Sequence, residues 1–118
     1  MTETHLLAIT AAHAARYLDA VDSRPIGAAA SLRELRTRLA RPLPEGPTAA
    51  AQVIDELVRD TEGGILGSAN GRFFGWVIGG VLPVALAADW LTSTWDQNAA
   101  SNLTAPARRS SKRCAARG

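Results

Sequence analysis

Cysteine is almost absent from this 118-residue chain, and its scarcity excludes whole classes of protein. A single cysteine, Cys114, cannot build an internal disulfide framework and fits a reducing compartment. The only two histidines, His5 and His13, lie about 12 Å apart along a helix, too far to share a metal ion. The sequence also contains no phosphate-binding loop and no Gly-x-Ser-x-Gly elbow. We therefore expect no metal site and no independent active site.

The sequence also gives no reason to expect a secretory leader or a membrane span. Residues 1–14 include Glu3 but no basic residue, so the charged start of a signal peptide is absent and we expect a cytoplasmic location. The uncharged run 73–88 is shorter than the roughly 20 apolar residues that a span needs. Gly75 and Gly79 nevertheless form a Gly-x-x-x-Gly spacing, which keeps a membrane-associated peptide as an alternative.

Acidic residues are absent from the end of the chain. Residues 108–118 hold five of the thirteen basic side chains and none of the eleven acids. The formal charge of +2 is therefore misleading, because residues 1–107 contain eight basic and eleven acidic residues and carry −3. A domain with that charge has no electrostatic attraction to nucleic acid or anionic lipid. We expect neither a nucleic-acid partner nor a membrane partner.

Helical patterns dominate what is present, within a globular composition of 47% apolar and 20% charged residues. Apolar residues recur with a period near 3.6 over residues 4–21, which predicts a helix that ends before Pro25. Ser31 and Glu34 have the spacing of a capping box, which predicts a second, short helix to about Leu39.

A third helix is expected over residues 48–61. We expect four of its apolar side chains to point inward: Val53, Ile54, Leu57 and Val58. Asp55 and Arg59 are spaced to form an outward ion pair. Gly63 and Gly64 follow at the place where a left-handed residue closes a helix.

The apolar run at residues 73–88 is interrupted by Gly75, Gly79, Gly80 and Pro83. We expect residues 73–78 to be extended and buried, and the pair Gly79 and Gly80 to allow a turn or a close approach. Pro83 is expected in the first turn of a fourth helix that runs to about Thr94.

The same region carries a family resemblance. It consists of Arg-Phe-Phe-Gly-Trp at residues 72–76, the glycine pair at 79–80, Ala-Asp-Trp-Leu-Thr-Ser-Thr at 88–94, and Asn98. In order and spacing this segment resembles the N-terminal portion of the pyridoxal-phosphate-dependent group II amino-acid decarboxylases, the superfamily of glutamate and aromatic-amino-acid decarboxylases. The resemblance covers roughly residues 25–106.

The resemblance implies a mainly α chain: the N-terminal helical arm of a fold type I enzyme, without its α/β cofactor domain. It divides the chain into an N-terminal helix at 1–24, the arm at 25–106 and a tail at 107–118. In the family, the complete enzyme is a homodimeric carboxy-lyase that acts on an amino acid and holds pyridoxal phosphate on a lysine. Lys112 is the only lysine here and matches no cofactor-lysine motif of the family. We expect this chain to bind no cofactor and to be inactive alone.

Specific positions carry over from the family only by resemblance. The substrate side of the pocket would include Trp76, Val77, Ile78, Gly79 and Gly80. Their apolar character suits an aromatic or other apolar amino acid better than glutamate. Asn98 matches a position near the dimer contact. Each position has a plain structural alternative, since apolar runs form cores and asparagines cap helix ends.

Two further expectations concern surfaces. Without the rest of an enzyme to cover it, the segment should expose four aromatic side chains and aggregate: Phe73, Phe74, Trp76 and Trp90. Arg72 and Asp89, at the borders of the apolar segments, are either a positioning pair or solvated charges.

The tail 107–118 has no Val, Leu, Ile or aromatic residue and is expected to be disordered. A shifted reading frame or a basic arm for RNA or a membrane surface would each explain its composition. A small helical protein that pairs with a full-length homologue remains an alternative to the truncated enzyme segment.

Overall fold

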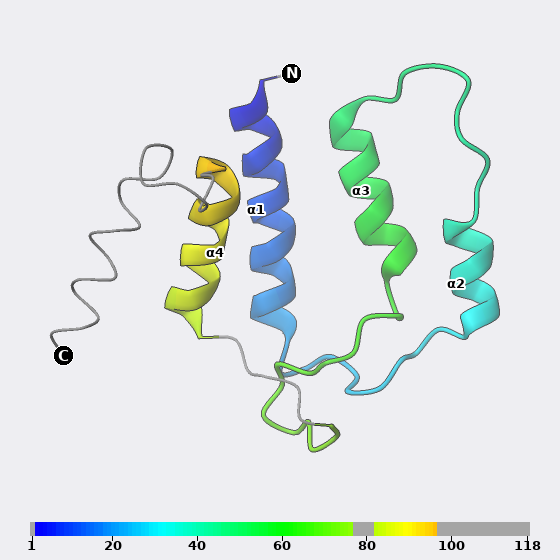
Figure 1. Cartoon of the computed structure of the whole chain (residues 1–118). Helices are drawn as coiled ribbons and strands as arrows, with labels where there is room; N and C mark the ends of the chain where they lie inside the picture. The colour runs from blue at the N-terminus through cyan, green and yellow to red at the C-terminus, as the bar shows by residue number, and fades with distance from the viewer. Residues whose placement is uncertain (1, 77–81, 97–118) are drawn as a thin grey trace, which may run out of the picture. The chain divides into compact units, whose positions relative to one another are not determined.

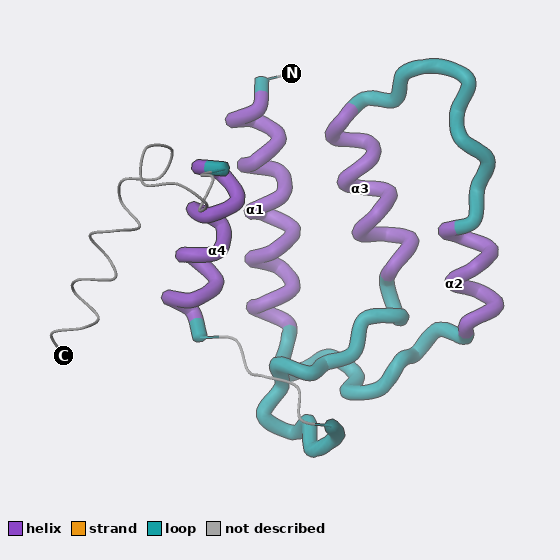
Figure 2. The backbone as a smooth tube through the Cα atoms, viewed as in Figure 1, coloured by secondary structure: helices purple, strands orange, loops and turns teal. Residues whose placement is uncertain are grey.

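The computed structural model describes residues 2–76 and 82–96. Within them lie four helices and no strand (Figures 1 and 2), which confirms a mainly α chain. The helices are α1 (Glu3–Ala20), α2 (Leu32–Leu39), α3 (Ala50–Thr61) and α4 (Pro83–Trp95). The chain divides into two units, Met1–Gly80 with the first three helices and Val81–Gly118 with the fourth. In the described residues, no helix combines the length and apolarity that crossing a bilayer requires.

Helix α1 begins and ends within one residue of the predicted bounds. The hydroxyl of Thr2 accepts a hydrogen bond from the backbone N–H of His5 at 3.3 Å and so caps the first turn. One face of the helix is half-buried, and it is formed by Leu6, Ile9, Thr10, Ala11, His13, Ala14, Tyr17 and Ala20. This face follows the helical period that the sequence shows.

Helix α2 starts at the predicted capping box. Ser31 Oγ accepts from the N–H of Glu34 at 3.3 Å, and a Glu34 carboxylate oxygen accepts from the N–H of Ser31 at 2.7 Å. The Ser31 hydroxyl also donates to this carboxylate at 2.6 Å. The side-chain and then the backbone hydrogen bonds from Ser31, with a smaller contribution from the charge of Arg38, lower the pKa of Glu34 below its usual value.

Helix α3 starts two residues later than predicted and ends at the expected glycines. Gly63 has φ +81°, and a Cβ added to it would lie 3.1 Å from the Cβ of Ala30. Its carbonyl accepts from the N–H groups of Ala29 (2.8 Å) and Ala30 (3.0 Å). The predicted left-handed cap is confirmed, and it also joins the end of α3 to the segment that precedes α2.

Helix α3 contacts both α1 and α2 and lies between them (Figure 1). Ile54 is half-buried, but the other three residues of the predicted inward stripe are exposed: Val53, Leu57 and Val58. The prediction of a buried stripe was therefore wrong for those three. In the described part of the first unit, α1 and α2 approach α3 from different sides and leave the stripe between them open.

Helix α4 agrees with its prediction. Pro83 occupies the first turn, where the missing N–H costs nothing, and the helix ends one residue past the predicted Thr94. Asp96 follows in the left-handed conformation with φ 44°. Apolar side chains stay exposed along the helix, including those of Val84, Trp90 and Leu91.

Candidate functional site

The aromatic turn, residues 73–76, is the described part of the predicted pocket. Phe74 is 93% exposed and Trp76 is 87% exposed, whereas Phe73 is half-buried. Trp76 has φ 34°, a conformation uncommon for a bulky residue, and the chain bends there. The expectation of burial is thus wrong for Phe74, Gly75 and Trp76, which are exposed, and the expectation of an extended chain is wrong for Gly75 and Trp76, where the chain bends. The expected exposure of aromatic side chains is confirmed for Phe74, Trp76 and Trp90, but Phe73 is half-buried.

The other positions carried over by resemblance lie outside the described residues: Val77, Ile78, Gly79, Gly80 and Asn98. The tail at 107–118 lies outside them too. Their roles stay predictions.

A buried asparagine holds the base of the aromatic turn. Asn70 is only 4% exposed, and its Nδ2 donates to the carbonyl of Val21 at 2.7 Å. Its Oδ1 accepts from the backbone N–H of Arg72 at 2.8 Å. The Arg72 guanidinium then donates to the carbonyls of Asp22 (2.7 Å) and Arg24 (3.2 Å). Asn70 therefore satisfies the carbonyl of Val21, the C-cap of α1, and Arg72 ties the start of the turn to the segment just after the helix.

A groove of about 590 Å³ runs between α1 and α3. Its apolar walls come from Ala14, Tyr17, Ile54, Leu57, Val58 and Ile65. Near the end of α1, the guanidinium of Arg24 lies 5.1 Å from the centre of the Tyr17 ring and pairs with Glu62 at 2.7 Å. The groove thus has an apolar floor and paired charges at its rim.

Histidine joins the two walls of this groove. His13 Nε2 lies 2.6 Å from Asp55 Oδ1, and His13 Nδ1 lies 2.6 Å from Nη2 of Arg16. The His13 side chain is only 15% exposed. Asp55 therefore pairs with His13 of α1, and the predicted pair of Asp55 with Arg59 is wrong.

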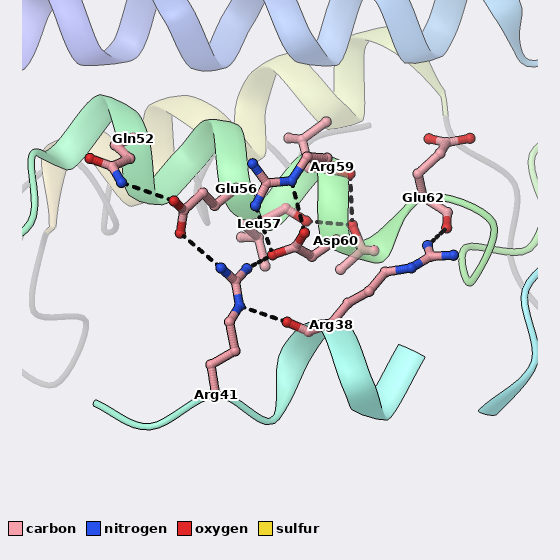
Figure 3. A network of polar contacts seen from close by, with 10 residues as sticks. Arg38, Arg41, Gln52, Glu56, Leu57, Arg59, Asp60 and Glu62 are labelled. Atoms are coloured by element: carbon pink, nitrogen blue, oxygen red, sulfur yellow. Dashed lines mark hydrogen bonds and ion pairs between the residues drawn. The ribbon is translucent and has the colours of Figure 1, made fainter. Parts of the chain in front are cut away.

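A second polar cluster joins α3 to the segment after α2 (Figure 3). Asp60 is 6% exposed and accepts from Arg59 Nε at 2.9 Å and Nη2 at 3.3 Å. Arg41 forms an ion pair with the same carboxylate and lies 3.6 Å from Glu56. Arg41 Nε also donates to the carbonyl of Arg38 at 2.8 Å. The guanidinium of Arg41 thus fixes the chain as it leaves α2.

The described side chains offer little for catalysis. They contain no cluster of three or more His, Cys, Asp or Glu that could hold a metal ion. Pyridoxal phosphate needs a lysine for its Schiff base. The sole lysine of the sequence lies outside the described residues, so no described side chain fits the cofactor in that way.

Sequence reasoning missed the residues that organise these contacts. Asn70 binds Val21, which lies 49 residues away in the sequence, and His13 binds Asp55, which lies 42 residues away. Neither contact has a local signature. Asp60 carried a weak signal, because an acid beside the apolar stripe of α3 needs a partner if it is covered.

No family model, curated protein or solved structure was found to match this chain.

Proposed function

We propose that this chain is the helical arm of a pyridoxal-phosphate-dependent group II amino-acid decarboxylase and that its role is to bind a cofactor-bearing body. The exposed aromatic turn carries the proposal, together with the family resemblance of residues 72–98. Phe74 and Trp76 are largely exposed in a chain whose described residues include no fully buried large side chain. Large exposed apolar groups of this kind mark binding surfaces.

The energy of such binding would come from a few side chains. Covering a side chain the size of Phe74 contributes about 1.5–3 kcal/mol, and buried tryptophans rank among the strongest contributors at interfaces. Asn70 and Arg72 hold the base of the turn to the end of α1. Because the start of the turn is already fixed before binding, less conformational entropy is lost when a partner binds.

In this proposal the chemistry belongs to the body. The body supplies the lysine for the cofactor, and the arm contributes an apolar wall to the substrate side through Trp76 and the residues that follow it. An apolar or aromatic amino acid is the substrate class that suits such a wall. The alternative is a small helical interaction protein that pairs with an intact homologue.

A reconstitution experiment tests the proposal. The chain is mixed with a complete group II decarboxylase and with the same enzyme after removal of its own arm, and co-purification and carbon dioxide release are measured. An arm should bind the shortened enzyme and restore part of its activity. Binding only to the intact enzyme supports the interaction protein. The proposal is wrong if the chain binds neither form or turns over an amino acid unaided.

Matched variants locate the surface. Replacing both Phe74 and Trp76 with serine should weaken binding at least 30-fold, the effect of roughly 2 kcal/mol from one hot-spot side chain, and on the order of 1,000-fold if each contributes that amount. Leu43 is 92% exposed but lies outside residues 72–98, the segment that carries the family resemblance. Leu43→Ser should therefore leave binding within about twofold of the unmodified chain, because an exposed side chain outside the contact contributes little.

A further inference from the structure

The two hydrogen bonds of the His13 ring determine which ring nitrogen carries the proton. A guanidinium has five N–H donors and no acceptor, so Arg16 can only donate to His13 Nδ1 across the 2.6 Å contact. Nδ1 must therefore be unprotonated. The ring's proton lies on Nε2, which donates to Asp55 at 2.6 Å. The structure thus contains the neutral Nε2–H form of His13, with both ring nitrogens hydrogen-bonded.

We propose that His13 is a pH-operated latch that holds Arg16 against α1 when neutral and releases it when protonated. Histidine is the side chain whose charge ordinarily changes between about pH 5 and 8. A proton added to Nδ1 turns this nitrogen into a donor, which then faces the N–H of Arg16 with like charge on both groups. The Arg16 contact must break, whereas the pair with Asp55 gains full charge on both sides.

The other charged groups near the His13 ring do not cancel the effect of its protonation. On α1, Asp19 lies three residues beyond Arg16, and both side chains are exposed, so a pair between them would be solvated and too weak to hold the released guanidinium. On α3, Asp55 is already bound to the ring. At the other end of the groove, Arg24 and Glu62 pair with each other. Protonation changes the charge of the set His13, Arg16 and Asp55 from zero to +1.

The switch acts at the rim of the α1–α3 groove, which both His13 and Arg16 line. Its α1–α3 connection persists in both states, because Asp55 accepts from the ring whether or not Nδ1 is protonated. Acidification therefore frees a cation at the rim while the two helices stay joined. A partner that presents a carboxylate to this rim would bind more tightly at pH 5 than at pH 8.

Nitrogen-15 NMR of the whole chain tests the latch. Long-range ring correlations identify the His13 tautomer at pH 8, and the Arg16 guanidinium signals report restricted rotation. We expect an Nε2–H ring and resolved Arg16 signals at pH 8, and averaged Arg16 signals once His13 is protonated. A ring protonated on Nδ1 at pH 8, or Arg16 signals that do not change through the His13 titration, would overturn the proposal.

Two glutamine variants separate the latch from non-specific effects of low pH on the chain. His13→Gln retains one acceptor and one donor but cannot titrate, so the Arg16 signals should lose their pH dependence over this range. His5 is exposed and its ring makes no contact within the described residues. His5→Gln should therefore leave the Arg16 transition intact. An unchanged transition in His13→Gln would also sink the latch, and the measurement on the unmodified chain decides the question if that variant does not fold.

Discussion

Neutralising the buried carboxylate of Asp60 should destabilise the first unit more than neutralising an exposed acid such as Glu45. The Asp60 carboxylate is 6% exposed and binds two guanidiniums, those of Arg59 and Arg41. Hydrogen bonds to charged groups contribute about 1.5–3 kcal/mol each. The side chains of Arg59 and Arg41 are 63% and 47% exposed, so both remain solvated when the acid is removed and the loss is smaller than for a buried pair.

We therefore expect Asp60→Asn to lower the free energy of unfolding by about 2 kcal/mol, the lower part of that range. Urea unfolding followed by circular dichroism at pH 7 measures this change, and added salt should weaken it only modestly because the carboxylate is covered. Glu45→Gln is the matched control, since Glu45 is exposed and makes no contact within the described residues. If Asp60→Asn and Glu45→Gln unfold at the same urea concentration, the network of Figure 3 does not stabilise the fold.

Three further changes test separate parts of the structure. Gly63→Ala forces a side chain into a left-handed conformation and should cost about 1–2 kcal/mol in thermal unfolding, whereas Gly27→Ala, with open space around its Cβ, should cost less than half of that. Asn70→Ala leaves the Val21 carbonyl without its donor and should cost about 1–3 kcal/mol, with faster proteolysis of the aromatic turn. Glu34 has a pKa below its usual value of 4.5 when folded, so the unfolded chain takes up this proton first as pH falls. The stabilisation is present above pH 4.5 and is lost as pH falls through the lower folded value, and Glu34→Gln should remove that part of the pH dependence of helicity.

The helices could be predicted because their signals are local. Ser31 and Glu34 are three residues apart and satisfy each other's backbone groups, so the start of α2 follows from sequence alone. Gly63 and Pro83 likewise act through their own backbone geometry. Helix α3 began later than predicted because Ala49 at its N-cap has no side-chain oxygen to fix the boundary.

The packing could not be predicted in the same way. The period of α3 shows which residues share a face, but burial depends on what lies opposite, and Leu57 and Val58 face an open groove. Asp55 and Arg59 have the spacing of an ion pair, yet His13 competes for Asp55 from a distant part of the chain, and Arg59 binds its neighbour Asp60. Competition between a local and a distant partner cannot be read from spacing alone.

The first unit has polar contacts that join distant segments of the chain, and it leaves apolar surface uncovered. Asn70, Asp60 and His13 each join segments that the chain brings together, while the α3 stripe and the aromatic turn remain exposed. Hydrogen bonds between neutral groups contribute only about 0.5–1.5 kcal/mol each in net stability, and those to charged groups about 1.5–3 kcal/mol. Much of the hydrophobic free energy therefore remains to be gained when a partner covers the apolar side chains. In the proposed role as an arm, segments already positioned by polar contacts would gain that energy with little rearrangement when a partner binds.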